Sequence, residues 1–246
     1  MKAVVLGGTS GMGREIARRL AERGDSVFLL GMAGPDLDRS AADVKARHPK
    51  QEEIGTAVCD LEHPEQFAGA LDAADRALGG FDTVVVTAAM FATQEQLEAD
   101  VELTRRLVTV NFANTVVFCE HVRKRLLSRG GGRLTVFSSV AGDRGRKPVA
   151  IYGSTKAGLS LYLEALDHKF HAQGLSVLCV KPGFVKTAMT AGLKPPPFAG
   201  EPERVADQVV RAMDAGKPVI YAPGIWALVM LVIRWLPRFV MRRIAF

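Results

Sequence analysis

Short apolar runs alternate along the chain with longer amphipathic stretches. The runs are continuous and rich in β-branched residues, which is typical of strands that are buried on both faces of a sheet. Joined by right-handed helical crossovers, such strands form a doubly wound parallel sheet. We therefore expect one α/β domain with seven parallel strands and helices on both faces. The predicted strands are 2–6, 26–30, 53–59, 82–88, 133–139, 175–180 and 218–222, and the predicted helices are 13–23, 36–47, 64–78, two within 94–129, 151–172 and 201–216.

The pattern changes after the last predicted strand. Residues 1–223 are expected to form the domain, and residues 224–246 a hydrophobic, basic tail. The apolar run 225–233 has nine residues, far fewer than the roughly 20 that span a bilayer. The tail is instead typical of a helix that lies in a membrane surface and is attracted to anionic lipids. The alternative is a helix packed in the interface of a homo-oligomer.

The residue types in the tail favour the membrane. Its arginines recur every four residues and would form one basic face if a helix continued through Pro237. Aromatic side chains would anchor such a helix at the interface. The basic positions are Arg234, Arg238 and Arg242, and the aromatic anchors are Trp226, Trp235 and Phe239.

The charge distribution argues against nucleic acid as a partner. The net charge is +6, but no acidic residue follows Asp214, whereas five of the bases do. The preceding body is nearly neutral, with no basic stripe for a phosphate backbone. The cysteines Cys59, Cys119 and Cys179 are far apart and form no metal-binding spacing. With no secretory signal at the start of the chain, we expect a cytoplasmic protein, peripheral on the inner face of the membrane, without a bound metal.

A glycine-rich loop, VVLGGTSGMG, joins the first strand to the first helix. Gly7, Gly11 and Gly13 permit a tight turn and a close approach of the backbone to a pyrophosphate at the helix N-terminus. This position predicts a Rossmann-type dinucleotide site, which also includes Thr9, Ser10 and Met12. Asp60, followed by Leu61 at the end of the third strand, is an acceptor for the adenine amino group. The second strand ends without an acidic residue to bind a ribose hydroxyl, which favours NADP over NAD as the cofactor.

Tyr152 and Lys156 lie four residues apart on a predicted helix and therefore share one face. A free tyrosine has a pKa of about 10 and is a poor base near neutrality. A neighbouring ammonium in a partly dry cleft would lower that pKa, so Lys156 is expected to tune Tyr152 and to hold the cofactor ribose. Ser139, at the end of the fifth strand, would orient a substrate carbonyl. Asn111 either supports a water that links to Lys156 or is a buried amide at a helix kink.

These motifs, in this order over residues 2–223, resemble the short-chain dehydrogenase/reductase family. The resemblance implies an Asn–Ser–Tyr–Lys tetrad at Asn111, Ser139, Tyr152 and Lys156. It also implies that the PGFVKT segment closes on the nicotinamide, where Val185 and Thr187 touch the carboxamide. The implied cofactor-binding residues are Gly7, Thr9, Ser10, Gly11, Met12, Gly13, Asp60, Leu61, Ala88, Ala89, Tyr152, Lys156, Pro182, Gly183, Val185 and Thr187.

Two segments depart from the family pattern. Leu6 stands where the family usually has Thr, and the segment 87–90 reads Thr-Ala-Ala-Met in place of Asn-Asn-Ala-Gly. Thr87 would replace the asparagine that braces the sheet. Met90 adds bulk near the cofactor cleft.

The tail and the motifs SVAGDRGRKP and YGSTKAGL resemble a narrower group, the bacterial decaprenylphosphoryl 2-keto-pentose reductases. That resemblance implies a hydrophobic or lipid-linked ketone as substrate and an oxidase of the same pathway as a possible partner. Two alternatives stay open. One is a soluble reductase of small ketones or ketoacyl compounds whose tail lies in an oligomer interface. The other is a cofactor-sensing or scaffold subunit without turnover.

Overall fold

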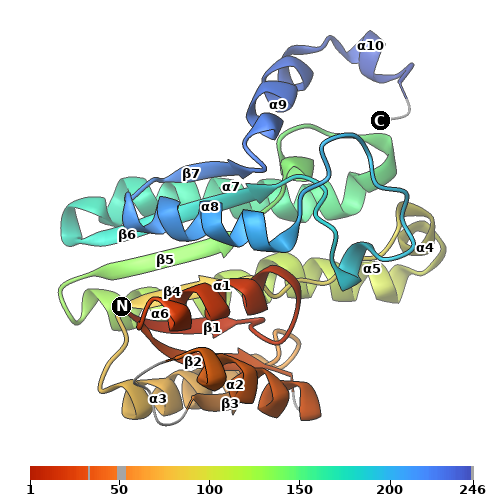
Figure 1. The fold of residues 1–246 in the computed structure, drawn as a ribbon. Helices are drawn as coiled ribbons and strands as arrows, with labels where there is room; N and C mark the ends of the chain where they lie inside the picture. Colours follow the sequence, from red (N-terminus) through yellow and green to blue (C-terminus); the bar gives the residue numbers. More distant parts are fainter. Residues whose placement is uncertain (33, 49–53, 245–246) are drawn as a thin grey trace.

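The computed structural model describes residues 1–246 apart from 33, 49–53 and 245–246. Seven parallel strands form one sheet in the order β3-β2-β1-β4-β5-β6-β7 (Figure 1). The order reverses between β1 and β4, so the crevice at the carboxyl ends of these strands is the expected place for a ligand. The prediction of a doubly wound parallel sheet is confirmed. The strands are β1 (Lys2–Leu6), β2 (Ser26–Gly31), β3 (Gly55–Val58), β4 (Thr83–Val86), β5 (Gly132–Phe137), β6 (Leu175–Pro182) and β7 (Val219–Ala222).

Helices cover both faces of the sheet, and each face has its own hydrophobic core (Figure 1). In β1, Val4 and Leu6 join the core beneath α3, α6 and α7, whereas Ala3 and Val5 join the core beneath α1, α2 and α8. This alternation explains why the strand is apolar at every position. The helices of the domain are α1 (Gly11–Glu22), α2 (Pro35–Arg47), α3 (Phe67–Leu78), α4 (Gln94–Ala99), α5 (Val101–Val108), α6 (Thr115–Leu127), α7 (Ala150–Phe170) and α8 (Pro202–Asp214).

The region 94–129 is more divided than the two predicted helices. The Asp100 side chain accepts hydrogen bonds from the backbone N–H groups of Glu102 and Leu103 at 2.9 and 3.0 Å. This cap starts α5 and separates it from α4. A π-helical turn, Thr109–Asn114, then separates α5 from α6. Residue 53, at the start of the third predicted strand, lies outside the described residues.

The tail folds as two helices, α9 (Ile225–Trp235) and α10 (Arg238–Met241). Leu236 is extended, with ψ of 131°, and Pro237 follows it. Proline lacks an N–H donor and drives the preceding residue out of the helical region. The condition for a single basic face, a helix that continues through Pro237, is therefore not met. In the described part of the chain, no helix has the length and apolar character needed to cross a membrane.

Candidate active site

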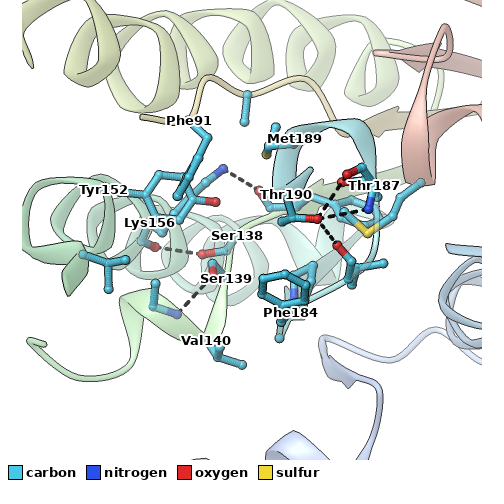
Figure 2. A pocket seen from close by; sticks show the side chains of 18 of the residues that line it. Phe91, Ser138, Ser139, Val140, Tyr152, Lys156, Phe184, Thr187, Met189 and Thr190 are labelled. Atoms are coloured by element: carbon cyan, nitrogen blue, oxygen red, sulfur yellow. Dashed lines mark hydrogen bonds between the residues drawn. The ribbon is translucent and has the colours of Figure 1, made fainter. Parts of the chain in front are cut away.

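Ser139 and Tyr152 meet where β5 ends and α7 begins (Figure 2). The Ser139 Oγ accepts a hydrogen bond from the backbone N–H of Ala141 at 3.1 Å, which fixes the residue at the start of a 3₁₀ turn. That turn packs directly on α7, because a Cβ at Gly153 would lie 2.7 Å from the carbonyl oxygen of Ala141. The small residue after Tyr152 thus lets the two segments approach closely enough to bring the two hydroxyls together.

Lys156 is almost completely buried beneath Tyr152. Its Nζ donates a hydrogen bond of 2.9 Å to the carbonyl oxygen of Phe137 and lies 5.8 Å from the centre of the Tyr152 ring. Burial lowers the pKa of Lys156 to about 8. A buried lysine so close to a tyrosine is favourable for a site in which protons move, because its charge is not fixed near neutral pH.

The pKa of Tyr152 differs from the sequence-based expectation. Burial raises it to about 12, and the hydrogen bond with Ser139 opposes this rise only in part. The ammonium of Lys156 points to the carbonyl of Phe137, not to the phenol oxygen. Without a cofactor bound, desolvation therefore outweighs the expected lowering by Lys156, and Tyr152 holds its proton.

Asn111 lies in the π-helical turn and is completely buried. Its Oδ1 accepts from the backbone N–H of Met90, and its Nδ2 donates to the Met90 carbonyl oxygen, both at 2.7 Å. Of the two roles expected of Asn111, this pairing matches the buried amide. The two hydrogen bonds position the segment after β4. The next residue, Phe91, packs edge-on against Tyr152, with ring centroids 5.4 Å apart. A water relay between Asn111 and Lys156 stays a prediction.

The glycine loop is held tightly between β1 and α1. Gly7 has φ of +88°, and a Cβ at Gly13 would lie 2.2 Å from the carbonyl oxygen of Gly7. Thr87 Oγ1 donates to the carbonyl oxygens of Leu6 and Gly7, at 3.1 and 3.2 Å. Thr87 thus ties the end of β4 to the loop, the bracing role expected of it.

The start of α1 suits a phosphate group. No side chain caps this helix, so its first N–H groups remain available to an anion. Three neighbouring hollows have lining residues in common. Together they extend from the glycine loop to Ser139 and Tyr152. This continuous cleft fits an extended dinucleotide. The predicted cofactor residues that line it are Gly7, Thr9, Ser10, Gly11, Met12, Gly13, Ala88, Ala89, Tyr152, Lys156, Pro182, Gly183, Val185 and Thr187.

Asp60 and Leu61 do not line these hollows. The Asp60 Oδ1 accepts from the backbone N–H of Glu62 at 3.0 Å, which organises the turn after β3. Leu61 belongs to the core beneath α3. Their contacts with an adenine ring stay predictions. Among the described residues, no group of three or more His, Cys, Asp or Glu is placed to hold a metal ion.

The catalytic cavity encloses about 330 Å³, and most of its wall is apolar. Four side chains form its outer wall, and they come from the segment after β4, the loop after β6 and the tail. The sequence marks Trp226 only as an anchor and Phe184 only as part of PGFVKT. Their meeting could not be predicted, because these distant segments come together only in the fold. The four side chains are Phe91, Phe184, Met189 and Trp226.

The predicted role of Trp226 is wrong. It was predicted to be an interfacial anchor, but only 5% of its surface is exposed. Its Nε1 donates to the carbonyl oxygen of Phe198 at 3.3 Å, and its ring lies against Gly183. Trp226, Met230 and Ile233 recur at helical spacing and form a small core with Val140. This spacing was the available signal for a buried face. Trp235 and Phe239, in contrast, are 81% and 61% exposed.

Comparisons with known proteins agree with this geometry. A family model described as short chain dehydrogenase matches residues 1–197. An uncharacterised oxidoreductase of Mycobacterium tuberculosis is 35% identical over 246 residues, which cover 98% of this chain and 95% of that protein. An uncharacterised oxidoreductase of Streptomyces coelicolor is 32% identical and covers 98% of this chain and 94% of its own length.

Two solved structures share the fold. A short-chain type dehydrogenase/reductase from Mycobacterium ulcerans has a TM-score of 0.81 at 24% identity, over 89% of this chain and 86% of that chain. An actinorhodin polyketide ketoreductase with NADPH has a TM-score of 0.79 at 24% identity, over 89% and 94%. The family match and the curated relatives make this protein an oxidoreductase that uses NAD(P). The chain belongs to the short-chain dehydrogenase family.

Proposed function

We propose that the protein is an NAD(P)H-dependent reductase of a hydrophobic or lipid-linked ketone, acting at a membrane surface. The observation that carries this proposal is the position of Ser139 and Tyr152 at one end of an apolar cavity, part of whose wall is the tail helix α9. A substrate with an apolar portion would enter past that helix and present its carbonyl to the two hydroxyls.

The proposed reaction needs one proton donor and one carbonyl-binding group. When bound, the reduced nicotinamide supplies the hydride that adds to the carbonyl carbon. Tyr152 donates its phenolic proton to the carbonyl oxygen, and the product is an alcohol. Ser139 donates a hydrogen bond to the same oxygen and orients it. Tyr152 carries the proton that a general acid must give, because its pKa lies well above neutral pH.

Membrane attachment is supported by the two apolar faces of α9. On the inner face, Trp226, Met230 and Ile233 form a small core with Val140, and Trp226 also lines the catalytic cavity. The outer face, with the spacing i, i+3, i+4 and i+7, is between 57% and 81% exposed. Apolar side chains beside basic ones suit an anionic lipid surface. The exposed residues are Leu228, Leu231, Val232 and Trp235.

Arg14 supports a preference for NADP. Its Nε is buried, and no hydrogen-bond partner for that atom is found among the described residues. Arg14 shares a hollow with Thr9 and Ser10 of the glycine loop. Three acids also line this hollow: Glu15 is paired with Arg18 and Asp36 with Arg39, whereas no ion pair of Glu203 is found among the described residues. Arg14 would bind the 2′-phosphate through its free Nε donor, against the charge of Glu203.

A polyprenyl-phosphate-linked 2-keto sugar is one substrate of this class, favoured by the resemblance of the tail and site motifs. An oxidase that supplies the ketone would complete an epimerisation, since oxidation followed by reduction on the other face inverts a carbinol centre.

The test is to follow NADPH and NADH oxidation with lipid-linked and small ketones, with and without vesicles that contain phosphatidylglycerol. Turnover confined to the lipid-linked ketones and increased by vesicles supports the proposal. Turnover of small ketones alone, unaffected by vesicles, contradicts it and favours the tail as an oligomer element.

Flotation with the same vesicles tests the tail separately. Leu228→Ser/Leu231→Ser should lose vesicle binding, because it removes exposed apolar surface from α9. Val101→Ser/Leu161→Ser removes surface that is equally exposed elsewhere, at 76% and 68%, and should bind as the unaltered protein does. Equal loss in both variants would contradict a specific role for α9.

A further inference from the structure

A basic groove lies between the segment before α7 and the C-terminal tail. It encloses about 450 Å³, and the described residues that line it include five cations and no acid. Two hydrogen bonds join its sides. Arg144 Nη2 donates to the carbonyl oxygen of Leu236 at 2.7 Å, and Lys147 Nζ donates to that of Arg242 at 2.6 Å. The basic groove is lined by Arg144, Gly145, Arg146, Lys147, Ala150, Arg238, Met241 and Arg242.

Arg146 connects the basic groove to the catalytic cavity, because it lines both. Burial lowers the pKa of Arg146, and the charge of Asp143 opposes this change. Asp143 is already engaged by Lys181 Nζ and by the Tyr221 hydroxyl, each at 2.6 Å. The single charge of Asp143 is thus shared between Lys181 and a groove that holds five cations.

Bringing five like charges around one hollow costs energy, which a bound anion would offset. Guanidinium groups that converge from two segments suit the several oxygens of a phosphate, which they can bind through paired hydrogen bonds. An aliphatic chain or a neutral sugar would bring no negative charge to these cations.

We propose that the basic groove binds a phosphate group of the substrate, while the ketone reaches past Arg146 to Ser139 and Tyr152. This inference rests on the proposed function and adds the chemical class of the group beside the ketone. The phosphate belongs either to a soluble phosphate ester or to a lipid phosphate, and the two sources share the same recognition chemistry.

Binding of inorganic phosphate, measured by titration calorimetry, tests the groove without turnover. Lys147→Ala/Arg242→Ala should weaken phosphate binding at least tenfold. Lys147→Arg/Arg242→Lys keeps both charges and should stay within about threefold of the unaltered protein. Arg204→Ala/Lys217→Ala removes two exposed cations outside the groove and should have no effect. No phosphate binding, or equal binding by the first variant, would overturn the proposal.

Two ketones that differ only in a phosphate group test, by turnover, whether the basic groove recognises the phosphate. The ratio of kcat/KM for dihydroxyacetone phosphate to that for dihydroxyacetone should exceed ten, and Lys147→Ala/Arg242→Ala should reduce the ratio to near one. The variant should turn over dihydroxyacetone normally, because both residues lie outside the catalytic cavity. An unchanged ratio would overturn the assignment. If no ketone is reduced, the proposed function fails, whereas calorimetry still decides on the groove.

Competition by vesicles separates the two sources. Release of bound phosphate by phosphatidylglycerol vesicles, but not by phosphatidylcholine vesicles, supports the groove as a lipid-phosphate site. Phosphate binding that persists with both vesicles supports the groove as a site for a soluble ester.

Discussion

The two sides of the catalytic cavity are built in different ways. The floor consists of Tyr152 and Lys156 on α7 and of Ser139 at the start of the 3₁₀ turn after β5. Backbone hydrogen bonds fix Ser139 in this turn and tie Lys156 to the end of β5. The outer wall comes from the segment after β4, the loop after β6 and the tail, and consists of Phe91, Phe184, Met189 and Trp226. A single isolated bridge, Val185 with Gly200, closes the loop.

This difference separates the chemistry from the choice of substrate. Regular elements hold reacting groups in fixed positions, whereas loops and termini can change without disturbing the core. In the proposed reaction, the floor would transfer a proton to the carbonyl, and the outer wall and the basic groove would determine which carbonyl compound is bound.

The largest effect is expected at the floor. Tyr152→Phe removes the proton donor, so kcat should fall by roughly 10²–10⁴-fold, while NADPH binding stays within about twofold. Stopped-flow absorbance and fluorescence titration measure the two quantities. Tyr162→Phe is the matched control on the same helix, since the Tyr162 hydroxyl binds Glu120 away from the cavity. Normal turnover by Tyr152→Phe would remove Tyr152 as the acid.

The buried lysine predicts a dependence of stability on pH. Its pKa falls from the ordinary 10.5 to about 8 in the folded chain. Between these values the unfolded chain binds more protons, so the free energy of unfolding rises with pH, by on the order of 3 kcal/mol in all. Lys156→Met should lack this rise.

Urea unfolding of both proteins at pH 7 and pH 10 measures the difference. The unaltered protein should gain stability relative to Lys156→Met as the pH rises. A constant difference would show that the folded structure does not perturb Lys156.

The outer wall has its own test at Gly183. A Cβ there would lie 2.1 Å from the Nε1 of Trp226, so Gly183→Ala must displace the indole. We expect a loss of about 1–3 kcal/mol in the free energy of unfolding and weaker binding of large ketones. Gly69→Ala, in α3 with no atom near the added methyl, should instead stabilise by up to about 1 kcal/mol. Equal effects would mean that Trp226 does not pack on Gly183.

The smallest effect concerns the cofactor end of the cleft. Arg14→Ala should lower kcat/KM for NADPH about tenfold relative to NADH, a change of about 1.4 kcal/mol. Arg18→Ala, one turn further along α1, removes a cation that is paired with Asp43 and should leave the ratio unchanged. The same ratio in both variants would exclude Arg14 as the phosphate-binding residue.

The floor was predictable because its signals are local. Helical spacing joins Tyr152 to Lys156, and Ser139 ends a strand that apolar residues define. The burial of Trp226 depends on Gly183 and on the Phe198 carbonyl, which are far away in the sequence. The partner of Asn111 is likewise the distant backbone of Met90.

The pKa of Tyr152 could not be read from the spacing, because desolvation depends on everything packed around the phenol. The break at Pro237 had a local signal, since proline ends helices. The basic groove is a property of the fold alone. It forms because the tail returns to the segment before α7.

The most direct test is a single-turnover reaction with NADPH that carries deuterium at the transferable position of the nicotinamide. The substrate is a ketone linked to a lipid phosphate, presented on vesicles that contain phosphatidylglycerol. The account predicts one deuterium at the new carbinol carbon for the unaltered protein and almost none for Tyr152→Phe under the same conditions. Tight NADPH binding without any deuterium in the product of the unaltered protein would contradict it.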